Sequence, residues 1–138
     1  MSEVRQAGAV AIGERGVLIE GAPGTGKSSL ALALIDRGAT LIGDDGVSLS
    51  LRDGRVWAAP PPITAGLIEI RNVGIVPLPT AEAAVALVLH LTPEAPRHVD
   101  EPELLDLLGR PVPFLRLHPG VWPLPLRAEW ALARYGLT

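Results

Sequence analysis

Residues 21–28 are Gly21-Ala22-Pro23-Gly24-Thr25-Gly26-Lys27-Ser28, and this stretch is the most informative part of the sequence. They match the pattern G-x-x-x-x-G-K-[ST], in which glycines let backbone N–H groups face phosphate oxygens and a helix start points at the same anion. There the lysine reaches the β- and γ-phosphates, and the serine hydroxyl joins the shell of a Mg²⁺ ion. Lys27 is also the only lysine of the chain. The stretch therefore predicts a site for a nucleotide and Mg²⁺, the alternative being a glycine-rich turn that binds nothing.

The residues around this loop favour an α/β fold. Residues 16–20 predict a short buried strand that enters the loop, and residues 28–37 predict a helix that Gly38 ends. The predicted fold class is a mixed sheet that contains the phosphate-binding loop (P-loop), with flanking helices. Further strands are expected at 8–12, 40–43, 47–51, 56–59, 84–91 and 112–117.

Other segments carry more specific expectations. The spacing of Asp100 and Glu103 is that of a capping box and predicts a helix to residue 108. A last helix over 128–135 is expected to pack Leu126, Trp130 and Ala133 on one face. A helical turn is expected at 63–67. The three tryptophans, Trp57, Trp122 and Trp130, are expected to be packing residues rather than a base-stacking platform.

Length and composition narrow the class of protein. The chain of 138 residues predicts a single domain, 1–138, that contains the P-loop. A net charge of −3 without a basic run argues against nucleic acid as a partner, and the lack of cysteine excludes disulfides and Cys-based metal sites. No apolar run is long enough for a membrane span, so we expect a cytoplasmic protein with no membrane partner.

Two adjacent carboxylates, Asp44 and Asp45, follow the predicted strand 40–43. In open α/β sheets, ligands bind beyond the carboxyl ends of the strands, so these aspartates are candidates for magnesium-assisted phosphoryl transfer. Successive side chains of a strand point to opposite faces, so only one of the two is expected to face the γ-phosphate easily. The alternative is a solvated turn.

A third motif follows at 69–74, Glu69-Ile70-Arg71-Asn72-Val73-Gly74, where Glu69 and Arg71 would share one face of an extended segment. A surface strand carrying an ion pair on one face is the alternative. With the loop and the aspartates, this motif makes the chain resemble the catalytic domain of the bacterial HPr kinase/phosphorylase family, in its short form without the N-terminal domain. The resemblance covers residues 4–118 and implies an ATP- and Mg²⁺-dependent kinase that acts on a serine of an HPr-like phosphocarrier protein. It also implies the reverse, phosphorylase reaction as an option, and an assembly of several copies as another.

The resemblance also implies roles for individual residues. Lys27 resembles the phosphate-binding lysine and Ser28 the first magnesium ligand, with Ser29 completing the nucleotide-binding segment. Asp45 resembles the proton acceptor, with Asp44 beside it, and Glu69 a second metal-associated carboxylate. Arg71 would hold the strand of Glu69, and Arg97 resembles a later arginine that meets phosphate.

Gln6 stands where family members usually carry a histidine. Glutamine can hydrogen-bond a carboxylate but does not titrate near neutral pH. A catalytically weakened nucleotide-binding regulatory module is therefore the alternative to an active kinase. A small-molecule kinase is a third reading, although the arginines expected of its lid are scattered here.

Overall fold

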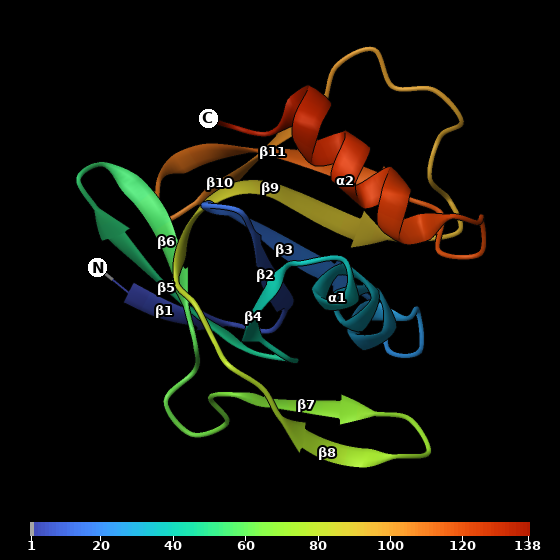
Figure 1. Ribbon diagram of the computed structural model, residues 1–138. Helices are drawn as coiled ribbons and strands as arrows, with labels where there is room; N and C mark the ends of the chain where they lie inside the picture. Colours follow the sequence, from blue (N-terminus) through green and yellow to red (C-terminus); the bar gives the residue numbers. More distant parts are fainter. Residues whose placement is uncertain (1) are drawn as a thin grey trace.

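The computed structural model describes residues 2–138, which form eleven strands and two helices (Figure 1). The strands are β1 (Ser2–Arg5), β2 (Gly8–Ile12), β3 (Arg15–Gly21), β4 (Thr40–Gly43), β5 (Val47–Arg52), β6 (Arg55–Ala59), β7 (Leu67–Ile70), β8 (Gly74–Pro77), β9 (Ala83–Leu91), β10 (Glu103–Leu107) and β11 (Arg110–Leu117). The helices are α1 (Lys27–Asp36) and α2 (Leu124–Tyr135). None of the helices in the described range is long and apolar enough to cross a membrane.

Nine strands form one curled sheet: seven follow the order β1-β5-β6-β9-β3-β2-β4, and the other two, β11 and β10, join it because β11 pairs with β9 and β10 pairs with β11. β3 pairs with β9 and β9 with β11 in parallel, whereas the other strand pairings within residues 2–138 are antiparallel, so the sheet is mixed, as predicted. Strand β9 is long enough to pair with β6 through its first residues and with β11 through its last four. Strand β4 pairs with β2 rather than with β3, so the two aspartates follow a strand two places away from the one that enters the glycine-rich loop.

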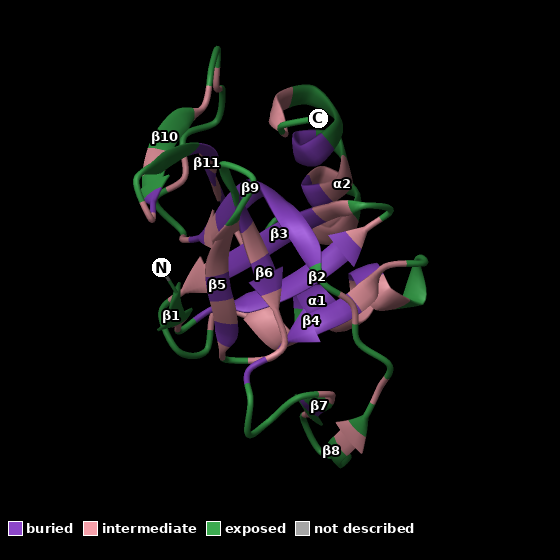
Figure 2. Ribbon diagram, turned by 90° about the vertical axis from the view of Figure 1, so that its left-hand side faces the viewer, coloured by how far each residue is buried: buried purple, intermediate pink, exposed green. Residues whose placement is uncertain are grey.

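The core lies on both faces of this sheet, and Figure 2 shows its central strands as almost entirely buried. On one face, α1 and α2 pack Leu30, Leu34 and Leu132 against side chains of β3 and β9. On the other, Leu18 of β3 and Val88 of β9 meet the side chains of β5 and β6. Each fully buried side chain of this size contributes about 1.5–3 kcal/mol, so α1 is held by packing as well as by its own hydrogen bonds.

The helix predicted over 100–108 is wrong, because Glu103–Leu107 is strand β10, paired antiparallel with β11. Leu108 and Gly109 both have positive φ, 52° and 84°, and form the two-residue turn of this hairpin. The Asp106 side chain accepts a hydrogen bond from the Gly109 N–H at 2.7 Å and closes the turn. Gly109 therefore shapes a hairpin turn instead of ending a helix.

The 69–74 segment is a hairpin rather than one extended strand. Strands β7 and β8 pair as a small separate sheet, which lies beneath the main sheet in Figure 1. Arg71 lies in the connecting turn with Asn72 at φ 66°, so it does not share a strand face with Glu69. Within residues 2–138 no ion pair joins these two residues. Residues 63–66 form a turn before β7 and no helix.

The face of helix α2 predicted to be buried, with Leu126, Trp130 and Ala133, is wrong. The buried residues of α2 are Ala128, Ala131 and Leu132, whereas Trp130 is 74 % exposed. Trp122, in the loop ahead of α2, is 84 % exposed, so two of the three tryptophans are not core residues. Ala128, Ala131 and Leu132 form the buried face of the helix, and Trp130 lies outside it.

Candidate functional site

The glycine-rich loop joins β3 to α1 through backbone conformations that favour glycine. Gly21, Gly24 and Gly26 have φ values of 153°, 83° and 96°. A Cβ at Gly21 would lie 2.7 Å from Thr25 Oγ1, so this position also needs the smallest residue for steric reasons. Thr25 Oγ1 donates to the Ala22 carbonyl at 2.8 Å and braces the loop from within.

Lys27 begins α1 and reaches back over the loop. Its Nζ donates to the Gly21 carbonyl at 2.7 Å, which holds the ammonium above the turn. The first turn of α1 contains no acidic residue, and no side chain caps it. Its free N–H groups and the helix dipole therefore give this end of the loop positive character suited to an anion.

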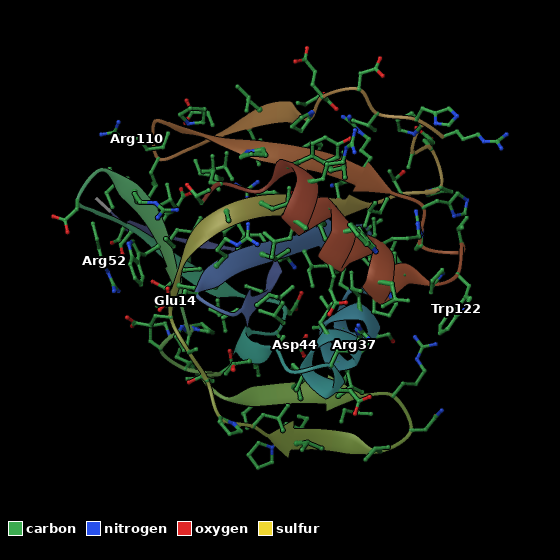
Figure 3. All side chains as sticks on the ribbon, turned by 45° about the horizontal axis from the view of Figure 1, so that its top comes forward. Glu14, Arg37, Asp44, Arg52, Arg110 and Trp122 are labelled. Carbon is green, nitrogen blue, oxygen red and sulfur yellow. The ribbon has the colours of Figure 1, made fainter. Side chains whose placement is uncertain are left out.

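Asp44 joins three segments at the mouth of the loop. Its Oδ1 accepts a hydrogen bond from Ser28 Oγ at 2.6 Å, and its Oδ2 accepts one from the Glu69 N–H at 2.9 Å. Asp44 follows the end of β4 at Gly43, where the Gly46 carbonyl approaches closely enough to leave no room for a Cβ. Figure 3 labels Asp44 near α1. The first aspartate of the pair, to which sequence gave no defined role, is thus the one that contacts the serine of the loop.

Asp45 differs from its neighbour in conformation and surroundings. Its backbone is left-handed, with φ at 60°, and its side chain is exposed. It nevertheless lines a cavity of about 510 Å³ in common with the predicted site residues Gln6, Lys27, Ser28, Asp44 and Glu69. Both aspartates therefore face the same cavity, although successive strand residues were expected to diverge. The reversal follows from the left-handed turn at Asp45, which no longer continues the strand.

A smaller cavity of about 300 Å³ adjoins the first one and shares Lys27, Ser28 and Glu69 with it. It brings Arg71 beside Ser28, Ser29 and Glu69. Arg97 is an exposed residue of the connection between β9 and β10, and it lines neither of these two cavities. Its assignment to phosphate stays a prediction.

The donor atoms at the loop fit a hard cation. Ser28, Asp44 and Glu69 offer only oxygen, which Mg²⁺ prefers, and Mg²⁺ commonly uses one or two carboxylates together with phosphate oxygens. Within residues 2–138, no group of three or more His, Asp or Glu side chains is arranged to hold a metal by itself. The residues therefore fit a magnesium ion that is shared with a bound phosphate chain.

One segment that lines a cavity beside the loop was not predicted from the sequence. Residues 119–126, ahead of and within the start of α2, line a third cavity, which reaches Thr25 and Gly26 of the loop. Nothing in their spacing indicated a ligand, and two of them, Trp122 and Leu126, were expected to be packing residues. Their exposure next to the loop became apparent only from the way α2 lies on α1.

The sequence of the chain is similar to that of one protein family along most of its length. The family model "HPr Serine kinase C-terminal domain" matches residues 2–88. The HPr kinase/phosphorylase of Clostridium novyi is 35 % identical over 138 aligned residues, which cover 88 % of this chain and 45 % of the relative. That of Clostridium botulinum strain Eklund 17B is 34 % identical over 110 residues, covering 70 % and 36 %. The chain thus spans less than half the length of these relatives.

A solved structure gives a likeness over nearly the whole chain. The Hpr(Ser) kinase/phosphatase from Coxiella burnetii superposes with a TM-score of 0.83 at 32 % identity, covering 95 % of this chain and 88 % of that one. The likeness includes the curled mixed sheet and both flanking helices. The fold, the sequence match and the arrangement around residues 21–28 agree, and the chain belongs to the HPr Serine kinase C-terminal domain family.

Proposed function

We propose that this chain is a P-loop kinase domain that transfers the γ-phosphoryl group of ATP to a serine hydroxyl of an HPr-like phosphocarrier protein. The observation that supports this most directly is the double hydrogen bond of Asp44. It gathers Ser28 and Glu69 at a cavity that Lys27 and Asp45 also line. The names of the relatives, HPr kinase/phosphorylase, support the choice of substrate.

The loop and the start of α1 would hold the phosphate chain. Their backbone N–H groups would point toward phosphate oxygens, and Lys27 Nζ would exchange the Gly21 carbonyl for a phosphate oxygen. A bound Mg²⁺ would neutralise charge that develops on the β- and γ-phosphate oxygens during transfer. Ser28, Asp44 and Glu69 are the residues that would supply oxygen ligands from the protein or hold those ligands in place.

Asp45 is the residue proposed to accept the proton. As the serine oxygen of the carrier forms a bond to the γ-phosphorus, the bond to the β–γ bridging oxygen breaks and ADP leaves. The serine proton passes to the carboxylate of Asp45. The side chain is exposed at the rim of the cavity, where a protein substrate could approach it. In the phosphorylase direction the same group would return the proton to the departing serine oxygen.

A weakened regulatory module remains the second candidate because of one observation. Gln6 lines the same cavity as Asp45, yet its amide cannot exchange a proton near neutral pH. If a titrating group is required at this place, the chain would bind nucleotide and transfer phosphate slowly. Gln6→His would then raise the rate of transfer.

The direct test is phosphate transfer from labelled Mg-ATP to the HPr-like protein encoded in the same genome. The unchanged chain is expected to label one serine, and Asp45→Asn is expected to lower the rate about 10²- to 10⁴-fold while nucleotide affinity is kept. Asp53→Asn is the matched control, because Asp53 also has a left-handed backbone, with φ at 53°, but lies in the turn between β5 and β6. Label that reaches the carrier at full rate in Asp45→Asn would overturn the assigned role. The absence of any transfer, with nucleotide still bound, would favour the regulatory module.

A further inference from the structure

An apolar groove of about 560 Å³ runs from the glycine-rich loop along α1 and lies outside the cavity assigned to phosphate transfer. One wall is the face of α1 that carries Ser29, Leu30 and Ala33, and the other is the segment 119–126. We call this the α1–α2 groove. Its volume is typical of small-molecule sites, which measure roughly 300–1,000 Å³. The family match ends at residue 88, so the segment 119–126 is a part of the site to which the matched sequence gives no role.

The groove begins where a phosphate chain would end. Thr25 and Gly26 belong both to the loop and to the lining of the groove. The polar cavity with Lys27, Asp44 and Asp45 shares none of its lining residues with the groove. A nucleotide whose terminal phosphate meets Asp45 would therefore direct its other end toward the groove.

The lining suits the ring system of a nucleoside. Most of it is apolar, from Leu30 and Ala33 on α1 to Val121, Pro123 and Leu124 on the other wall. Trp122 also lines the groove, and Figure 3 shows it on the loop ahead of α2. Its indole is 84 % exposed, so a broad aromatic surface is free to be covered by a base. Aromatic side chains bind bases through stacking regardless of base identity.

The groove is held in shape before any ligand arrives. Arg127 Nη1 donates to the carbonyls of His118 and Val121, at 3.0 and 2.9 Å, and so ties the loop to α2. At the far end, Arg37 Nε donates to Glu129 Oε1 at 2.9 Å and joins the end of α1 to α2. A preformed site loses less conformational entropy on binding than a mobile loop would.

We infer that the α1–α2 groove holds the nucleoside of the bound nucleotide, with the base against Trp122. The inference deepens the proposed function and rests on it, because it requires the phosphates to lie in the loop. It makes a nucleoside triphosphate, rather than an inorganic polyphosphate, the preferred ligand. The groove would supply the part of the affinity that comes from the base.

The test compares two ligands that share a chain of three phosphates, Mg-ATP and magnesium tripolyphosphate, by calorimetry on the full chain. Trp122→Ala is expected to weaken ATP binding at least about fivefold and to leave tripolyphosphate binding within about twofold. Trp130→Ala is the matched control, since Trp130 is a tryptophan of α2 that is also largely exposed, at 74 %, but does not line the groove. It is expected to change neither affinity.

A second variant tests the groove by filling it. Ala33→Phe adds a ring to the α1 wall and is expected to weaken ATP binding while tripolyphosphate still binds. Tryptophan emission gives an independent readout: ATP should alter it in the unchanged chain and in Trp130→Phe, but not in Trp122→Phe. Circular dichroism spectra would show that each variant is folded.

The outcomes separate the two proposals. If ATP and tripolyphosphate bind the unchanged chain equally well, and Trp122→Ala and Ala33→Phe alter neither affinity selectively, the groove does not hold the nucleoside and the phosphate site stands. If neither ligand binds the unchanged chain, the proposed function is wrong and this inference is wrong with it.

Discussion

Replacement of Asp44 tests the site and the fold together, because its carboxylate ties the start of α1 to strand β7. It accepts one hydrogen bond from Ser28 Oγ and one from the Glu69 N–H. A hydrogen bond to a charged group contributes about 1.5–3 kcal/mol, and solvent around this half-buried carboxylate lowers each contribution to about 1–1.5 kcal/mol. Asp44→Ala is therefore expected to lower the free energy of unfolding by about 2–3 kcal/mol. For a chain of this length that corresponds to a Tm lower by roughly 6–12 °C.

Asp44→Asn separates the geometry from the charge. The amide oxygen can still accept from the Glu69 N–H, and the amide NH₂ can donate to Ser28 Oγ, so the loss of stability should stay near about 1 kcal/mol. The negative charge is lost, however. The concentration of Mg²⁺ that supports half-maximal phosphate transfer should then rise about 10- to 100-fold.

Urea unfolding followed by circular dichroism measures the first effect, and magnesium titration of phosphate transfer measures the second. Asp45→Asn is the control for stability, because Asp45 is exposed and asparagine tolerates its left-handed backbone. It should change the free energy of unfolding by no more than about 0.5 kcal/mol. If Asp44→Ala is as stable as the unchanged chain, or if Asp45→Asn destabilises it equally, the structural role given to Asp44 is wrong.

Two further predictions concern the loop and a surface ion pair. Gly21→Ala should cost about 1–3 kcal/mol because its Cβ would meet Thr25 Oγ1 at 2.7 Å, whereas Gly24→Ala should cost only about 1 kcal/mol, from backbone strain, because nothing lies within 4 Å. Equal thermal midpoints of the two variants would contradict this. The Arg52 guanidinium, through its hydrogen bond to Glu82 at 2.8 Å, lowers the pKa of that carboxyl below its ordinary value of 4.5. The pair therefore stabilises the fold above about pH 4.5, and this contribution is lost as the pH falls through the lowered pKa. An NMR titration should show the Glu82 pKa rising in Arg52→Ala, and an unchanged value would argue against the pair.

Much of the fold could be predicted because several segments carry a single strong signal. The apolar run of β9 indicated a buried strand. The Asp53-Gly54 pair, which has positive φ at both residues, is typical of the tight turn found between β5 and β6. The segment 100–108 gave two signals. The Asp100 and Glu103 spacing matches a capping box, but the same residues can alternate along an edge strand, and pairing with β11 decided between them. Local patterns cannot weigh a partner strand that lies further along the chain.

The sequence could predict which residues belong to the candidate site, but it could not predict how they contact one another. The lysine and serine of the loop follow from the motif, whereas the motif does not say which of the two aspartates contacts Ser28, and the left-handed turn that lets Asp45 face the same cavity as Asp44 is visible only in the structure. Trp122 and Trp130 were expected to be packing residues, but both are exposed. Trp130 lies outside the face of α2 that buries Ala128, Ala131 and Leu132, and Trp122 lies in the loop ahead of the helix, and hydrophobicity alone reveals neither position.

The length of β9 has a practical consequence for anyone who trims this protein. The family match stops at residue 88, in the middle of a strand whose last four residues pair with β11. The Leu137 N–H also donates to the Ala86 carbonyl at 2.9 Å, so the residues after α2 contact the same strand. A polypeptide that ends at residue 88 would lack β11 and the C-terminal residues that pair with β9, and one edge of β9 would be left without a partner. Exposed strand edges pair with other chains, so we expect this polypeptide to aggregate on expression. The segment matched by the family model, residues 2–88, is therefore shorter than the segment that folds as one unit.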